Sequence, residues 1–118
     1  MLSPKLTVDI VAAQFDLTRG QLLGRSHLPR IVLARHVAML LALEMVPYAS
    51  LSAVGSWFGS RHHTTVLHAA ESMRRKIATD RKFAREVEDL RRIIRKDDVL
   101  KALTKAKRKP VPKMTRTN

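Results

Sequence analysis

The sequence contains no cysteine, which excludes disulfide bonds, thiol catalysis and thiolate metal sites. Aromatic residues make up only 4%, so a core must come from Leu, Val, Ile, Ala and Met, a composition that favours helices over sheets. The longest uncharged apolar stretch near the middle, 37–43, is far shorter than the ~20 residues that cross a bilayer. The N-terminus lacks the pattern of a signal peptide. We therefore expect no membrane association and a cytoplasmic location.

Acidic residues are scarce as well: 23 Lys and Arg stand against 10 Asp and Glu, a formal net charge of +13. Such an excess opposes folding by self-repulsion and usually has a polyanionic partner, with nucleic acid the first candidate and an anionic membrane the second. Residues 101–118 hold seven Lys and Arg and no acid, which leaves +6 for residues 1–100. We expect a folded basic domain over 1–101 and a disordered basic tail over 102–118.

Apolar periodicity, capping residues and helix breakers predict an all-α, compact six-helix bundle with no strand and no internal repeat. The expected helices span about 4–15, 19–23, 31–46, 51–58, 61–79 and 80–101. The third is apolar around nearly its whole circumference, which indicates a buried central helix. The apolar positions expected on one side of the first helix are Leu6, Ile10 and Ala13, with Val11 beside them. Core-facing positions are expected in the fifth and last helices at Val66, Ala70, Met73, Ile77; and Phe83, Val87, Leu90, Ile94.

Residues 50–70 carry the functional pattern: a short capped helix, a tight turn and a longer helix, which is the layout of a helix-turn-helix. Gly59 suits a turn that needs a positive φ. The second helix is expected to begin near Arg61, followed by two histidines and two threonines. These hydrogen-bonding side chains stand at the end that enters a major groove, where base edges offer donors, acceptors and the thymine methyl. The exposed amides there favour phosphate.

The segments LSAVG at 51–55 and FGSRHHTTVLHA at 58–69 closely resemble the signature of the C-terminal DNA-binding domain (domain IV) of the bacterial replication initiator DnaA. The family pattern is roughly Ser-Leu-x-x-Ile-Gly-x-x-Phe-Gly-Gly-Arg-Asp-His-Thr-Thr-Val-x-His-Ala. Weaker similarity extends over about 8–94, including 34–39 on the third helix. The resemblance implies a Trp-repressor-like helix-turn-helix in a six-helix bundle that binds double-stranded DNA.

The resemblance also implies site residues. Base contacts are expected from the start of the recognition helix, at His62, His63 and Thr64. Contacts with the DNA backbone or minor groove are expected from Arg25, Arg30, Arg35, Leu51, Ser52, Arg61, Thr65 and His68. Among these, the amides around Leu51 and Ser52 would hold a phosphate. The family's minor-groove arginine corresponds to either Arg25 or Arg30.

Two departures from the family pattern stand out. His62 replaces an aspartate; a carboxylate accepts a hydrogen bond from cytosine N4, whereas a neutral imidazole can donate to guanine N7 or O6. We therefore predict an altered target sequence. The sequence also holds no Gly-x-x-x-x-Gly-Lys-Ser/Thr loop, so ATP-driven assembly is not expected of this chain alone. Binding remains, in a transcription regulator, an accessory replication factor or a competitor for initiator sites, associated with the nucleoid.

Three alternatives remain. The chain could coat nucleic acid non-specifically, as a nucleoid or RNA-binding protein, through charge alone. The basic last helix and tail could dock a protein partner. The histidines could bind a metal, but the spacing of His62, His63 and His68 does not bring their side chains together on one helix face. We expect no metal, no cofactor and no enzymatic activity, because no nucleophile with a matched base and no paired carboxylates are evident.

Overall fold

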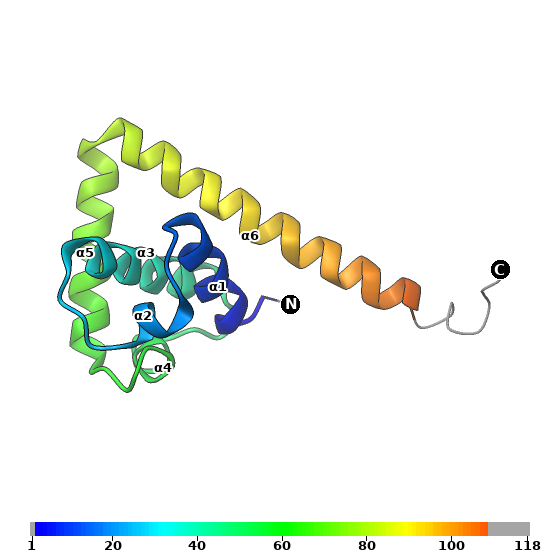
Figure 1. Ribbon diagram of the computed structural model, residues 1–118, viewed down its shortest axis with the longest axis horizontal. Coiled ribbons are helices and arrows are strands. Elements are labelled where there is room, and N and C mark those ends of the chain that lie inside the picture. The colour runs from blue at the N-terminus through cyan, green and yellow to red at the C-terminus, as the bar shows by residue number, and fades with distance from the viewer. Residues whose placement is uncertain (1, 109–118) are drawn as a thin grey trace.

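The computed structural model describes residues 2–108, with side chains through residue 98, and shows six helices and no strand in that part of the chain (Figure 1). The helices are α1 Pro4–Gln14, α2 Arg19–Leu23, α3 Pro29–Met45, α4 Leu51–Trp57, α5 His63–Thr79 and α6 Arg81–Arg108. The predicted all-α class and the order of the helices are confirmed.

Polar side chains cap the starts of α1, α2 and α4. The Ser3 hydroxyl accepts from the Leu6 amide at 3.1 Å, and the Ser50 hydroxyl accepts from the Ala53 amide at 3.1 Å. Thr18 forms a reciprocal capping box with Gln21. Each cap satisfies a backbone N–H that has no partner within the first helical turn.

Helix α3 is the central element, as its apolar circumference predicted. It packs against α1, α2, α4 and α5. Its buried residues are Ile31, Ala34, Arg35, Val37, Ala38, Met39, Leu40, Leu41 and Ala42. A helix with neighbours on most sides exposes no broad polar face, so its one buried charge, Arg35, must find partners inside the bundle.

The core faces of α5 and α6 agree with the sequence. Val66, Ala70 and Met73 are buried with Ile77 packed against them, and Phe83, Val87, Leu90 and Ile94 are buried on α6. The prediction for α1 was partly wrong: Ala13 is exposed and Ile10 only half-buried. The buried residues are Leu6, Thr7, Val8, Val11 and Ala12, because α1 rests on both α3 and α6 and therefore buries a broader face.

Three helix boundaries differ from the predictions. Helix α3 begins at Pro29, whose missing N–H and fixed φ suit a first helical position. Helix α5 begins at His63 rather than Arg61, with His62 as its N-cap. Helix α6 continues past Lys101 to Arg108, through good helix formers at the start of the predicted tail. The rest of that tail, 109–118, lies outside the described residues.

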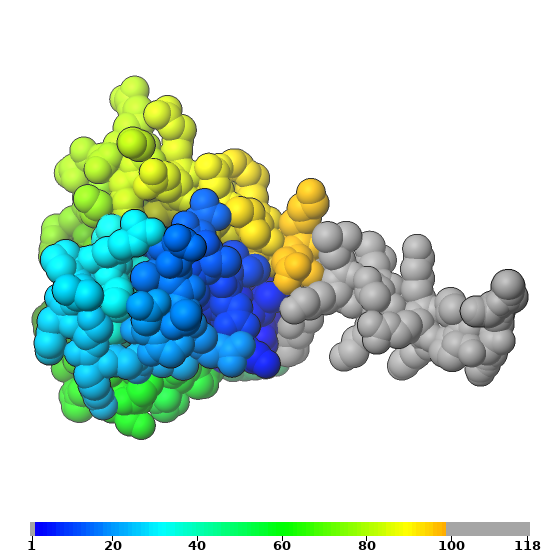
Figure 2. All heavy atoms as spheres, viewed as in Figure 1, coloured from blue at the N-terminus to red at the C-terminus, as the bar shows by residue number. Residues whose placement is uncertain are grey.

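The bundle brings the helix-turn-helix to one edge of the molecule. Residues of α4 and the following turn lie along the lower edge in Figure 2, and α6 starts at the opposite end of α5 (Figure 1). Helix α6 packs on α5 and α1 before it extends beyond the bundle. The Arg91 guanidinium, paired with Glu44 of α3 at 3.0 Å, ties α6 to the central helix.

Candidate nucleic-acid interface

The turn between α4 and α5 is held by two consecutive residues with positive φ, Gly59 at 75° and Ser60 at 58°. The sequence predicted the first and not the second. After the turn, the Arg61 amide donates to the Gly55 carbonyl at 2.9 Å. A Cβ on Gly55 would overlap the Arg61 carbonyl oxygen, so only glycine allows this close approach of α4 to the start of α5.

The N-terminus of α5 is capped by an imidazole. His62 has an extended backbone conformation, and its Nδ1 accepts from the Thr64 amide at 3.2 Å. The same Nδ1 lies 2.8 Å from the Thr64 hydroxyl oxygen. The neighbouring His63 ring lies 4.3 Å from the His62 ring, centroid to centroid. These contacts order the side chains that the sequence assigned to base contacts.

The N-cap and the first two turns of α5 present polar side chains to solvent. His62, His63, Thr64, Thr65 and His68 are all exposed. The His68 Nδ1 lies 3.8 Å from a Glu71 carboxylate oxygen on the same helix. These five predicted site residues therefore share one accessible surface around the start of α5, which can offer hydrogen-bond donors and acceptors to a ligand of matching shape.

The first turn of α4 carries the predicted phosphate-holding residues. Ser52 is exposed and Leu51 half-buried, directly after the Ser50 cap. Upstream, Tyr48 has a left-handed φ of 64° and is 93% exposed, a rare combination for a large aromatic residue. No local motif in the sequence marks Tyr48, because its backbone conformation and exposure are set by the α3–α4 connection.

Arg35 does not lie on this surface. It is only 4% exposed, and its guanidinium donates to three carbonyls: Leu22 at 2.7 Å, Ser26 at 3.0 Å and Gln21 at 3.1 Å. This burial argues against the expected contact with the DNA backbone. We assign Arg35 a positioning role, in which α3 fixes the end of α2 and the connection that follows.

Arg61 complements Arg35 from the helix-turn-helix. Its half-buried guanidinium donates to the carbonyls of Leu23, at 3.3 Å, and of Gly24 and Phe58. The last carbonyls of a short helix have no intrahelical partner, and a positive charge suits that end of the helix dipole. Arg35 and Arg61 together satisfy the end of α2, which fastens it to the turn between α4 and α5.

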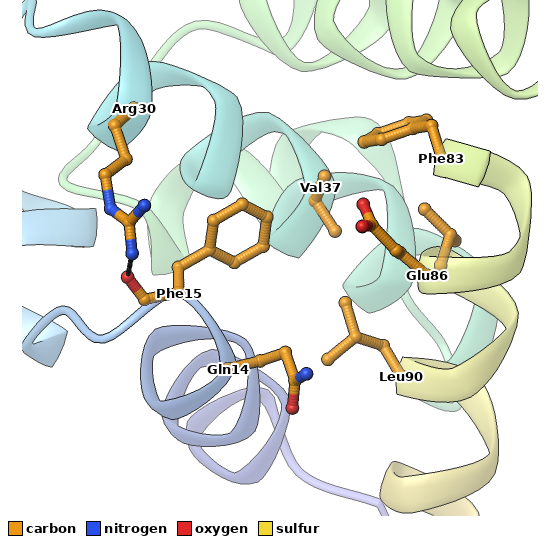
Figure 3. Close-up of a pocket in the computed structure, with 8 residues that line it drawn as sticks. Gln14, Phe15, Arg30, Val37, Phe83, Glu86 and Leu90 are labelled. Atoms are coloured by element: carbon orange, nitrogen blue, oxygen red, sulfur yellow. Dashed lines mark hydrogen bonds between the residues drawn. The ribbon is translucent and has the colours of Figure 1, made fainter. Parts of the chain in front are cut away.

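The two remaining predicted arginines point to different parts of the molecule. Arg25 is exposed and donates to the Gly59 carbonyl at 3.0 Å, so it lies beside the turn. Arg30 donates to the Phe15 carbonyl (Figure 3). There it borders a cavity of about 270 Å³ whose other lining residues are Gln14, Phe15, Val37, Phe83, Glu86, Val87 and Leu90, none of them from α4 or α5.

The positive charges beneath the turn act on one another. Burial, and secondly the charge of Arg25, lower the pKa of Arg35. Burial, followed by the charges of Arg35 and Arg25, lowers the pKa of Arg61. Burial and the charges of Arg35 and Arg61 also lower the pKa of His36. The carbonyl groups that accept from Arg25, Arg35 and Arg61 solvate these three guanidinium ions without neutralising them. The electrostatic field near the turn is therefore positive and favours an anionic ligand.

The structure also bears on the metal and the membrane as ligands. Among the residues that the structure describes, no group of three His, Asp or Glu side chains is arranged to hold a metal ion. No helix in the described range is long and apolar enough to span a bilayer.

Comparison with known proteins places the same residues in a family. Residues 4–73 match the family described as the bacterial dnaA protein helix-turn-helix. The chain is similar to the chromosomal replication initiator protein DnaA of Brucella abortus, with 42% identity over 85 residues, 72% of this chain and 17% of that protein. It is also similar to the DnaA of Lactobacillus delbrueckii, with 37% identity over 86 residues, 73% of this chain and 19% of that protein. It therefore spans less than a fifth of these relatives.

Proposed function

Because the chain belongs to the bacterial DnaA helix-turn-helix family, we propose that it binds double-stranded DNA at a defined sequence through the start of α5. The observation that supports this most is the exposed polar surface made by His62, His63, Thr64, Thr65 and His68. Residues at the amino end of a recognition helix are the ones that reach base edges in a major groove.

The proposed roles divide that surface in two. His62, His63 and Thr64 contact bases, because they stand on the cap and first turn of α5. Thr65 and His68 contact phosphates on one flank, and the start of α4, at Leu51 and Ser52, contacts a phosphate on the other. Contacts of the second kind hold the protein in register and carry no sequence information by themselves.

Arg25 is our candidate for the minor-groove residue. It is exposed and already bonded to the turn through Gly59, whereas Arg30 is directed to the end of α1. Arg35 and Arg61 support the interface without reaching the DNA bases, since their guanidinium groups hold the end of α2. In this proposal Arg25 contacts DNA, whereas Arg35 and Arg61 position the chain segments that form the interface.

For the biological role, we propose control of transcription or of DNA replication in the cytoplasm, on the nucleoid. The sequence has no ATP-binding loop, so the residues at hand account for binding and not for ATP-driven melting of DNA. A module of this kind acts by occupying its site, as an activator, a repressor, an accessory replication factor or a competitor for the sites of a DnaA initiator. Its basic last helix could add a protein contact.

The test is in-vitro selection from random duplexes, followed by affinity measurements on the selected sequence. We expect a defined consensus that differs from the DnaA box. In the double variant His63→Ala, Thr64→Ala the preference for this duplex over a scrambled one should fall by at least ~10-fold, because each base contact is worth about 1–3 kcal/mol. Arg85→Ala on α6 is the control, and its preference should match that of the wild type.

The same measurement addresses the competing function. A protein that coats DNA or RNA through charge alone would show no consensus, and the double variant would behave like the control. That outcome would replace the proposed function with non-specific nucleic-acid binding.

A further inference from the structure

The cap of α5 uses one nitrogen of the His62 ring. Its Nδ1 accepts from the Thr64 amide, which can only donate. Nδ1 therefore carries no proton, and in the neutral ring the proton stands on Nε2. The Thr64 hydroxyl oxygen lies 2.8 Å from the same unprotonated Nδ1, so the hydroxyl donates to it and shares its single lone pair with the amide. The cap of α5 thus determines which atoms of His62 and Thr64 donate hydrogen bonds and which accept them.

Two polar groups of the cap, the Nε2–H of His62 and the hydroxyl oxygen of Thr64, can still face a ligand. Nε2–H lies on the edge of the His62 ring opposite to the cap and is a donor. The Thr64 hydroxyl directs its O–H toward the cap, so the lone pairs of its oxygen remain available as acceptors. Both residues are exposed, and the His63 ring lies beside the His62 imidazole, 4.3 Å away from centroid to centroid.

We propose that this cap determines the base preference of the protein: His62 donates to guanine, and Thr64 accepts from the amino group of a neighbouring adenine or cytosine. Guanine presents two acceptors, N7 and O6, in the major groove, whereas cytosine presents the N4 amino donor. An Nε2–H donor matches the first and opposes the second. The inference rests on the proposed function, because it concerns how the same surface distinguishes bases.

A purely structural role for His62 makes a different prediction. If the imidazole only capped α5, any residue that caps equally well would leave the DNA consensus unchanged. Asn and Asp are both good N-caps, since a side-chain oxygen of either one accepts from the backbone amide. They differ in the group that they turn outward: the Asn amide retains a donor, and the Asp carboxylate offers only acceptors.

The experiment compares His62→Asn with His62→Asp in the full chain, on duplexes that differ only at the base assigned to His62. His62→Asn should keep the wild-type preference for guanine. His62→Asp should reverse it in favour of cytosine, and each preference should amount to about 5- to 150-fold in affinity. Thermal unfolding of both variants should coincide, because both retain the cap. Thr64→Val should weaken discrimination at the adjacent base, whereas Thr64→Ser should retain it.

A second measurement needs no DNA. Nitrogen-15 spectra of the free protein at neutral pH should show His62 with a protonated Nε2 and an unprotonated Nδ1. The opposite tautomer would overturn the inference, as would a guanine preference that His62→Asp leaves intact or a reversal that His62→Asn shares. A wild-type chain without any preferred duplex would instead overturn the proposed function itself.

Discussion

At the scale of single residues, two arginines organise the support of the interface. Arg35 and Arg61 come from different parts of the chain, yet both donate to carbonyls at the end of α2. A five-residue helix satisfies few of its own carbonyls, so its end depends on outside donors. A guanidinium suits this task because its five N–H groups spread in one plane and reach several acceptors at once.

Arg35→Ala should therefore lower the free energy of unfolding by about 2–4 kcal/mol, because hydrogen bonds from a charged group disappear and buried carbonyls are left without donors. Arg35→Lys keeps the charge but not the planar fork, and it should lose more than half as much. Urea denaturation measures both variants against the exposed Arg85→Ala, which should stay within about 0.5 kcal/mol of the wild type. Equal stability of Arg35→Ala and this control would show that the three bonds contribute nothing.

The half-buried His36 gives stability a defined pH dependence. Burial lowers its pKa in the folded protein, and the charges of Arg35 and Arg61 lower it further. The unfolded chain therefore binds a proton at His36 more readily than the folded protein does. The contribution of neutral His36 to the free energy of unfolding is complete above the ordinary histidine pKa of about 6.5, and it is lost as pH falls through the lower pKa of the folded protein.

We expect the urea midpoint to fall when pH is lowered from about 7.5 to about 5 and this fall to be smaller in His36→Gln. The exposed His27→Gln is the matched control and should keep the wild-type slope. The explanation fails if His36→Gln retains that slope too.

At the scale of elements, the helix-turn-helix is recognisable in the sequence because its signals are local. The Ser50 cap, the positive φ of Gly59 and the polar start of α5 lie within about fifteen residues of one another. The role of Gly55 is not recognisable there, because it depends on how closely the Arg61 backbone crosses α4. The start of α5 differs for a related reason: the sequence pattern places His62 in the first turn, whereas its ring is the cap.

Gly55→Ala tests this close approach. The new Cβ would overlap backbone atoms of Arg61, which cannot rotate away, so the turn must open. We expect the free energy of unfolding to fall by roughly 2 kcal/mol or more, which is within the range for overpacked sites. DNA affinity should also fall, while the helix content stays close to that of the wild type. Gly20→Ala is the control: its Cβ would meet only the Thr18 Oγ1 at 3.9 Å, and the helix should gain about 0.5–1 kcal/mol. Circular dichroism measures helix content and thermal stability, and duplex titration measures DNA affinity, for both Gly55→Ala and Gly20→Ala.

At the scale of the whole molecule, we propose that charge raises the strength of DNA binding and that the start of α5 sets its selectivity. The net charge of +13 is divided almost equally between residues 1–100 and 101–118. In this proposal the bundle positions α5, and the lysines and arginines of residues 101–118 add attraction that does not depend on the DNA sequence. Neutralising phosphates releases counterions, so affinity from such contacts falls steeply with salt.

Deletion of residues 102–118, which removes six Lys and Arg, should weaken binding to the preferred and to a scrambled duplex by about the same factor. The dependence of affinity on salt should also become shallower, by roughly 0.9 in the logarithmic slope for each phosphate that the shortened chain no longer neutralises. A variant of equal length with these six residues changed to Gln is the control for chain length and should match the deletion. A weakening confined to the preferred duplex would contradict a non-specific role.

The sequence by itself determined the helix order, the core faces of α5 and α6 and the polar surface at His63 and Thr64, because caps, breakers and apolar periodicity act over a few residues. Only the tertiary structure decided that Arg35 is buried, that Arg25 lies beside the α4–α5 turn while Arg30 lies at the end of α1, and that His62 caps α5. Apart from the nearby Phe58 carbonyl, the backbone carbonyls that accept from Arg35 and Arg61 lie 9 to 38 residues away, and such carbonyls leave no mark in the side-chain pattern. The partner of a polar side chain depends on which chain segments the packing of apolar faces brings together.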